Sequence, residues 1–291
     1  MAKKEGGAVA VPRDEQWTAT DPRAQGLDAL EAGRRVGRAV GLRALAPARV
    51  RDMKRPRPRG NIPPMHDALS NPTLTAASQR ALSGLRDFSM LQWYVIPLLA
   101  VLFYVYATEA QKARRSGDWA PVLAGLTLFG MDFVNESVNG WILALSGRSA
   151  LWTAPGPTAL RTMVGWNLEI MFMFAISGII YHHSLSDDPQ QRPLWRRREA
   201  WAIAALYSAF CVFIELFLNK GGLLVWEYAF WTNSVAGVWL IFLFGYFHFY
   251  VGVILVLSLR RLRSRLMAIG GIYGTAIALN IFGLGVMGWQ Y

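Results

Sequence analysis

Residues 235–258, VAGVWLIFLFGYFHFYVGVILVLS, contain no aspartate, glutamate, lysine or arginine over 24 consecutive positions. A helix rises ~1.5 Å per residue, so about 20 apolar residues cross the ~30 Å hydrocarbon core of a bilayer. In lipid, backbone polar groups must find partners within a helix or a closed barrel. This stretch therefore predicts a membrane-spanning helix and decides the class of the protein.

Five further apolar stretches lie before and after it. They cover about residues 88–108, 119–146, 160–184, 200–219 and 267–288. Of the 291 residues, 53% are hydrophobic and 17% are charged, whereas soluble domains carry about 25% charged residues. The sequence predicts an all-α fold over residues 88–291, a polytopic transmembrane bundle of about six helices in a plasma or inner membrane.

Residues 1–87 have a different character. They are basic and contain few aliphatic runs, which is typical of disorder. Within them, residues 27–46 repeat apolar side chains near helical spacing, with arginines largely on the other side. That pattern predicts an amphipathic helix, either lying on a membrane surface or forming transiently without a partner. We expect residues 1–87 to form a disordered, partly amphipathic basic tail.

The formal net charge of +11 raises the question of nucleic-acid binding. From residue 89 onward, however, most Lys and Arg flank apolar stretches, where basic residues encode orientation. Eleven follow the first, third and fifth expected helices, and three follow the second and fourth. This asymmetry predicts that the first set of loops is cytoplasmic, that both termini face outward and that nucleic acid is not a partner. The basic tail must then cross the membrane unless one span is miscounted, so its side stays open.

Acidic side chains interrupt three of the expected helices. Asp132, Glu136 and Asn139 fall within an arc of about 60° on one helix. Glu169 and Glu215 lie in the next two helices. A charge at mid-bilayer costs roughly 2.5–3.5 kcal/mol even on insertion scales. The sequence therefore predicts a catalytic site formed by Glu136, Glu169, Asp132 and Glu215.

Three further polar residues are predicted to bind a substrate: Asn139, Asn219 and Glu227. Residues 221–233, GGLLVWEYAFWTN, are apolar but too short to span, which predicts a re-entrant or interfacial lid that presents Glu227. Two alternatives stay open. Asn135, Asn139 and Asn167 can serve as hydrogen-bonding contacts between helices, worth about 0.6 kcal/mol each, and Glu215 can form an interfacial ion pair with Lys220.

A metal has little support in the sequence. His248 is the one plausible nitrogen ligand near the acids, and it is a weak candidate because it stands alone in an aromatic run. Cys211 is the single cysteine, which excludes a disulfide framework and a thiolate metal site. The chain has no HExxH and no GxxxxGK[ST] motif. The sequence indicates no particular cofactor.

The acids favour a membrane-embedded enzyme that applies carboxylate acid/base chemistry, with or without a metal, to a lipophilic substrate. Partial desolvation can keep one carboxylic acid protonated as a donor while a neighbour stays ionised, and Glu136 with Glu169 is the predicted pair. A proton- or cation-coupled transporter is the alternative, and a non-catalytic subunit of a membrane complex is the second. Acids that converge on one closed cavity favour the enzyme, acids along a path between both sides favour the transporter, and polar faces turned to lipid favour the subunit.

The expected partners follow from these patterns. They are the lipid bilayer and a small lipophilic substrate or an ion. Gly270 and Gly274 are four residues apart on one expected helix, and small residues at this spacing allow close helix contact. They predict a helix–helix contact, including one between copies of the chain.

Overall fold

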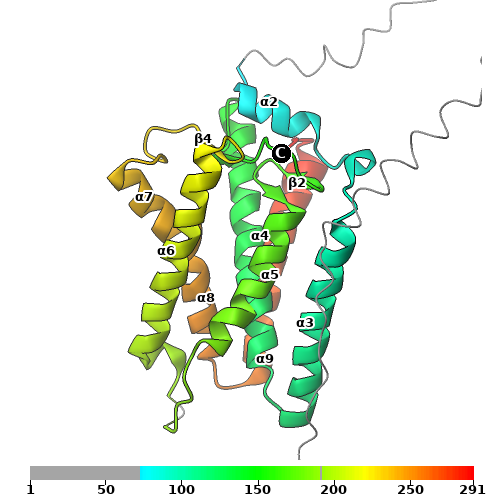
Figure 1. Ribbon diagram of the computed structural model, residues 1–291. Coiled ribbons are helices and arrows are strands. Elements are labelled where there is room, and N and C mark those ends of the chain that lie inside the picture. The colour runs from blue at the N-terminus through cyan, green and yellow to red at the C-terminus, as the bar shows by residue number, and fades with distance from the viewer. Residues whose placement is uncertain (1–72, 191) are drawn as a thin grey trace, which may run out of the picture. The chain divides into compact units, whose positions relative to one another are not determined.

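The computed structural model describes residues 73–190 and 192–291, which form a bundle of long helices (Figure 1). Most of the predicted tail, including residues 27–46, lies outside the described residues. Its last part forms helix α2, Ala76–Ser83, in which Thr75 caps the first turn by accepting a hydrogen bond from the Ser78 N–H. Ala81 of this helix is fully buried. The packed structure therefore begins before residue 88, where we expected the membrane domain to start.

Within the described residues, the helices form six rods. The first four rods are α3 (Val95–Ser116), α4 (Ala120–Ser146), α5 (Leu168–His183) and α6 (Arg198–Lys220). The fifth joins α7 (Val235–Ile241), the π-helical segment η4 (Phe242–Phe247) and α8 (His248–Leu257). The sixth joins α9 (Leu262–Asn280) to the π-helical segment η5 (Ile281–Val286). Two short 3-10 helices, η2 (Phe88–Met90) and η3 (Leu194–Arg196), precede α3 and α6.

Three rods are long and apolar enough to cross a membrane: Arg198–Lys220, Val235–Leu257 and Leu262–Val286. Helix α5 is apolar but has only 16 residues. Helix α4 has 27 residues, but its middle carries Asp132 and Glu136. The prediction of a helical, multi-pass membrane protein is confirmed, whereas the number of six spans is not.

The third expected helix begins later than predicted. Residues Arg161–Met163 (β2) and Trp166–Asn167 (β3) form an antiparallel hairpin instead. Helix α5 starts only at Leu168, where the Asn167 side chain accepts a hydrogen bond from the Ile170 N–H at 2.9 Å. The hairpin was not predicted because a short apolar stretch reads alike as strand or helix.

Helix α4 lies in the middle of the bundle and packs against α5, α8 and α9. Its contact with α5 depends on glycine, since a Cβ atom at Gly178 would collide with the backbone of Ala124. Small residues at such crossings let two helices approach closely. Gly270 and Gly274 differ, because a Cβ atom at either would meet nothing within 4 Å. The predicted contact through these two glycines stays a prediction.

Short strands and the C-terminus close one end of the bundle (Figure 1). There Trp152–Thr153 (β1) pairs antiparallel with Val225–Trp226 (β4). The predicted lid, residues 221–233, contains β4. The carboxylate of Glu227 accepts a hydrogen bond from the Thr75 hydroxyl at 2.6 Å. The buried Tyr291 ring fills the space left by the missing side chain of Gly140, so this end is tied down by both α2 and the C-terminus.

Candidate functional site

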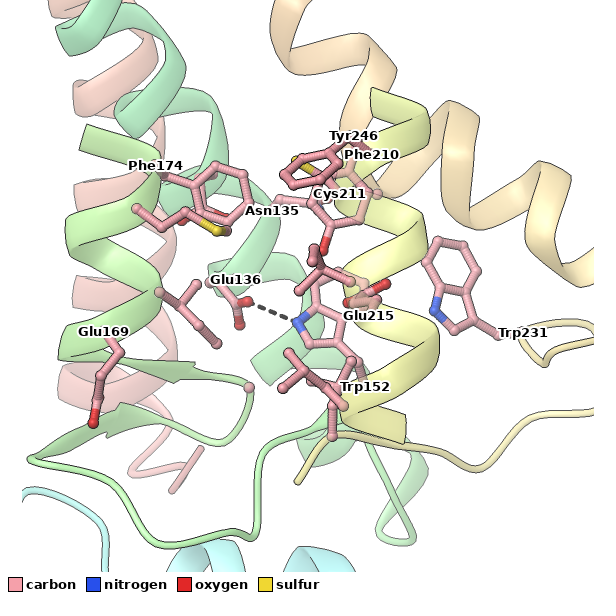
Figure 2. A pocket seen from close by; sticks show the side chains of 18 residues that line it. Asn135, Glu136, Trp152, Glu169, Phe174, Phe210, Cys211, Glu215, Trp231 and Tyr246 are labelled. Atoms are coloured by element: carbon pink, nitrogen blue, oxygen red, sulfur yellow. Dashed lines mark hydrogen bonds between the residues drawn. The ribbon is translucent and has the colours of Figure 1, made fainter. Parts of the chain in front are cut away.

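The acidic cavity is a space of about 230 Å³ between α4, α5, α6 and η4, and Trp152 of β1 is part of its lining (Figure 2). All four predicted catalytic acids line it: Asp132, Glu136, Glu169 and Glu215. They come from three different helices. The rest of the lining is mostly apolar, so the carboxyl groups face a space of low polarity.

Indole N–H groups hold the two acids of α4. Trp152 donates to Glu136 Oε1 at 2.7 Å, and Trp166 donates to Asp132 Oδ2 at 2.7 Å. The Trp166 ring stacks on Phe133 with 5.2 Å between ring centroids. Since the indoles and both carboxyl groups are buried, this arrangement fixes the acids before any ligand arrives, as preorganised sites require.

Two carboxyl oxygens in this cavity have no partner. Glu136 Oε2 and Glu215 Oε2 are buried, and neither makes a hydrogen bond within the part of the chain that the structure describes. The Tyr246 side chain lies close enough to Glu215 to interact with it. A buried polar atom without a partner costs about 1–3 kcal/mol. Such atoms are rare in native proteins and call for an explanation, and a bound ligand or water supplies one.

Glu169 is held differently. Its Oε1 accepts from the Tyr94 hydroxyl at 2.7 Å and the Ala159 N–H at 2.8 Å, and its Oε2 accepts from the Thr158 hydroxyl at 2.5 Å. In Figure 2 its carboxylate points away from Glu136. Glu169 thus lines the cavity but uses both oxygens to anchor the start of α5. The geometry favours Glu215, rather than Glu169, as the second carboxyl group of an acid/base pair with Glu136.

The three predicted substrate-binding residues do not line the cavity. Asn139 donates to the Trp152 carbonyl at 2.8 Å and accepts from the Leu151 N–H at 2.8 Å. Asn219 donates to the Leu224 carbonyl at 3.1 Å, and Glu227 faces Thr75. All three side chains shape the loops that cover the cavity. The alternative of structural contacts has a different outcome for each asparagine: Asn135 donates to the Phe244 carbonyl of η4 at 3.5 Å, whereas Asn139 contacts loop backbone and Asn167 caps α5.

The predicted metal ligand also lies elsewhere. His248 is the first residue of α8 and is not among the residues that line the acidic cavity. In residues 73–190 and 192–291, no group of three or more His, Cys, Asp or Glu side chains is placed to hold a metal ion. The described acids therefore do not converge as a ligand set.

Aromatic side chains form much of the wall, and the sequence did not reveal them. Trp152 and Trp231 stack with 5.7 Å between ring centroids. Trp231 is only 5% exposed. Phe174 and Tyr246 stack at 5.9 Å. The one available signal was the density of Trp residues after the second expected helix, which hydropathy alone does not distinguish from an interfacial belt.

The cavity reaches the outer surface of the bundle between α5 and α6. Three apolar lining residues are themselves exposed there: Met173 on α5, and Phe210 and Ile214 on α6. The opening of the cavity is therefore apolar.

Comparison with known proteins places these features in a family. Residues 75–285 match an uncharacterized membrane protein family, and this range contains every residue that lines the acidic cavity. An uncharacterized protein of Archaeoglobus fulgidus is 36% identical over 215 residues, which cover 74% of this chain and 99% of that protein. No solved structure matches this chain.

Proposed function

We propose that this chain, which belongs to this uncharacterized membrane protein family, is a membrane-embedded enzyme that applies acid/base chemistry to a lipophilic substrate. The observation that carries the proposal is the pair of unpartnered, buried carboxyl oxygens of Glu136 and Glu215, which line one apolar cavity. The grouping of these acids along one cavity favours chemistry over a path through the membrane. Its apolar opening between α5 and α6 favours a substrate that enters from lipid.

Glu136 and Glu215 act as the proton donor and the proton acceptor. Two ionised carboxylates facing one apolar space repel each other, so one carries a proton while the other is ionised. The protonated acid gives its proton to one atom of the substrate, and the carboxylate removes a proton from another. The reaction is redox-neutral and returns the enzyme to the same total number of protons. Asp132, held by Trp166 one turn from Glu136, sets the local field.

The bundle crosses the membrane six times, with α3, α4 and α5 as the additional spans. Residues from the start of α4, the ends of α5 and α8 and the starts of α6 and α9 meet around a second cavity at one end of the bundle. Successive rods therefore alternate in direction. Arginines lie at that end and are sparse at the other, which supports a cytoplasmic location for it.

The test compares lipid extracts of membranes from cells that make the wild-type protein, Glu136→Gln or Glu215→Gln. Glutamine keeps the size and a carbonyl acceptor but cannot carry a transferable proton. Each variant should lower the amount of a wild-type-dependent lipid product by about 100-fold or more, the usual contribution of a positioned acid or base. Glu227→Gln is the matched control, since it removes a carboxylate outside the cavity and should leave the product unchanged. A wild-type product level in the two cavity variants would refute the proposal.

Protonation can be tested without the substrate. Dicyclohexylcarbodiimide is apolar and adds to protonated carboxyl groups, so peptide mass spectrometry should find the adduct at Glu136 or Glu215. Glu169, which accepts three hydrogen bonds, should stay unmodified. An adduct confined to Glu169 would reverse the assignment.

A proton-coupled transporter is the second candidate, because the π-helical segment η4 contributes Gly245 and Tyr246 to the cavity wall. Single π-helical turns are frequent at functional sites and interrupt the regular ladder of a helix. Proteoliposomes containing a pH-sensitive dye distinguish the two functions. Proton flux that Glu136→Gln abolishes, without any lipid product in the wild type, would establish transport instead of catalysis.

A further inference from the structure

A second cavity, of about 700 Å³, lies at the end of the bundle opposite the strands β1 and β4. We call it the arginine cavity. Five arginines line it together with His182 and a single acid, Asp188. The arginines come from two segments that are far apart in the sequence, one between α5 and α6 and one that runs from the end of α8 into the first turn of α9. They are Arg192, Arg196, Arg197, Arg260 and Arg265.

Three of these arginines are fixed by contacts within the protein. Arg192 forms an ion pair with Asp188 at 3.0 Å. Arg197 donates to Glu199 at 2.8 Å. Arg265 donates to the carbonyl group of Leu257, the last residue of α8, at 2.7 Å and to that of Leu259 at 2.8 Å. These contacts hold the three guanidinium groups in place in the wall of the cavity.

The other two arginines lack a neutralising partner. Arg196 lies over the ring of Trp195, with 4.7 Å between its Cζ and the ring centroid. Across the described residues, neither Arg196 nor Arg260 forms an ion pair with a carboxylate. The hydrogen bonds from Arg192 lower the pKa of Asp188 to about 2, so the only acid in the lining stays ionised and committed to Arg192. The cavity therefore keeps a surplus of positive charge.

The position of this cavity suits a ligand at the membrane surface. It lies at the ends of α5, α6, α8 and α9, beside Trp195, and tryptophan is enriched at the level of the lipid headgroups. Basic pockets between membrane helices on the cytoplasmic side bind phosphate-bearing headgroups. Guanidinium is planar and matches phosphate oxygens with two parallel N–H donors. The volume also lies within the range of small-molecule sites, about 300–1,000 Å³.

We propose that the arginine cavity binds the phosphate group of a ligand, with Arg196 and Arg260 as the two residues that pair with it. The shared chemistry is a phosphate ester, supplied either by an anionic lipid of the adjacent leaflet or by a free phosphate compound. Binding joins the start of α6 to the turn between α8 and α9. These segments are already in contact, because the backbone N–H of Trp195 donates to the Ser258 hydroxyl at 3.1 Å. The site does not depend on the proposed chemistry of the acidic cavity, but its place at the cytoplasmic surface rests on the proposed topology.

The experiment uses the full-length protein in nanodiscs of phosphatidylcholine alone or with 20 mol% phosphatidylglycerol, and a third arm with phosphatidylcholine plus inorganic phosphate. Bound lipid is counted by native mass spectrometry, and the melting temperature is measured in parallel. Wild-type protein should retain phosphatidylglycerol and melt at a higher temperature than in phosphatidylcholine. Stabilisation by inorganic phosphate alone would identify a free phosphate compound as the ligand. No response in either arm would overturn the proposal.

Variants assign the effect to this cavity. Arg196→Gln with Arg260→Gln should weaken phosphatidylglycerol or phosphate binding by about tenfold or more, and Arg260→Gln alone serves if the double variant does not fold. The matched control is Arg114→Gln with Arg115→Gln, which removes the same charge from exposed positions in the last turn of α3. Equal loss in both double variants would show general charge attraction and overturn the site.

Discussion

The acidic cavity and the arginine cavity are bordered by the same rods, α4, α5, α6 and α7–η4–α8, yet they hold charge in opposite ways. In the acidic cavity, carboxyl groups are buried in an apolar wall, and two of their oxygens lack partners among the described residues. In the arginine cavity, the wall is polar and several charged groups are already paired with protein atoms. Burying a polar group without a hydrogen-bond partner lowers the stability of the fold, whereas a guanidinium group that stays in water has little effect on it. The first arrangement fits chemistry, and the second fits recognition.

The same contrast occurs on a smaller scale inside the acidic cavity. Glu169 accepts three hydrogen bonds from protein donors. Glu136 accepts one from Trp152, and its Oε2 has no partner in the part of the chain that the structure describes. The carboxylate of Glu169 is thus used by the protein, whereas Glu136 keeps one oxygen without such a contact. The following predictions test this division.

The largest effect on stability is expected for Glu169→Leu. This change leaves the Tyr94 and Thr158 hydroxyls and the Ala159 N–H without their acceptor, and each such loss costs up to about 1–3 kcal/mol. Since these donors are only partly buried, we expect a total loss of about 3 kcal/mol in the free energy of unfolding. The measurement is unfolding by SDS titration in mixed micelles.

Glu136→Leu is the matched change in the same cavity. It removes the acceptor of a single donor, Trp152, and also removes a buried carboxyl group. We therefore expect a loss of only about 1 kcal/mol. Equal losses in the two variants would mean that Glu136 is as structural as Glu169, and would end the distinction between the two acids.

The sequence allowed prediction of those parts that depend on local patterns. Apolar runs predicted the helical rods, and carboxylates within such runs predicted the four acids. Each of these signals can be read from the sequence of one helix without its neighbours. The roles of the acids could not be predicted in this way. The donors to Glu169 come from Tyr94 and from Thr158 and Ala159, and the donor to Glu136 follows from the fold of the loop after α4.

The arginine cavity shows the same limit. Its basic residues were interpreted only as orientation signals at the ends of helices, since each segment alone shows nothing more. The cavity exists because the packing of α4, α5 and α8 brings two distant segments together at one end. Likewise, Asn139 looked like a binding residue because it shares a helix face with Asp132 and Glu136. Its amide is used instead by the backbone at Leu151 and Trp152.

An intermediate effect is expected for Trp152→Phe. Phenylalanine keeps an aromatic ring against Trp231 but removes the N–H that fixes Glu136. A positioned acid loses efficiency when its orientation is no longer fixed, so the lipid product should fall about tenfold while the protein stays folded. Trp231→Phe is the control, because Trp231 donates to no carboxylate among the described residues and the product should change less than threefold. Equal effects would point to the shape of the wall rather than the hydrogen bond.

The smallest effect is expected for pH on phosphatidylglycerol binding, which should change less than twofold between pH 5.5 and 8.5. The charged and titratable groups at the arginine cavity are His182 on α5, Asp188, Arg192, Arg196 and Arg197 before α6, Glu199 on α6, and Arg260 and Arg265 around the turn into α9. Arginine stays protonated throughout this range, and a phosphodiester stays ionised.

Asp188 does not alter this expectation. Its pKa in the folded protein is about 2, below the ordinary aspartate value of about 3.9. A lowered carboxylate pKa stabilises the folded state above the unfolded value, and the stabilisation is lost only as pH falls through the folded value. That window, roughly pH 4 down to 2, lies entirely below the range of the experiment. Binding that weakens steeply between pH 6 and 7 would instead follow a histidine. In that case His182, rather than Arg196 and Arg260, would hold the phosphate, which His182→Gln would show by removing the pH dependence.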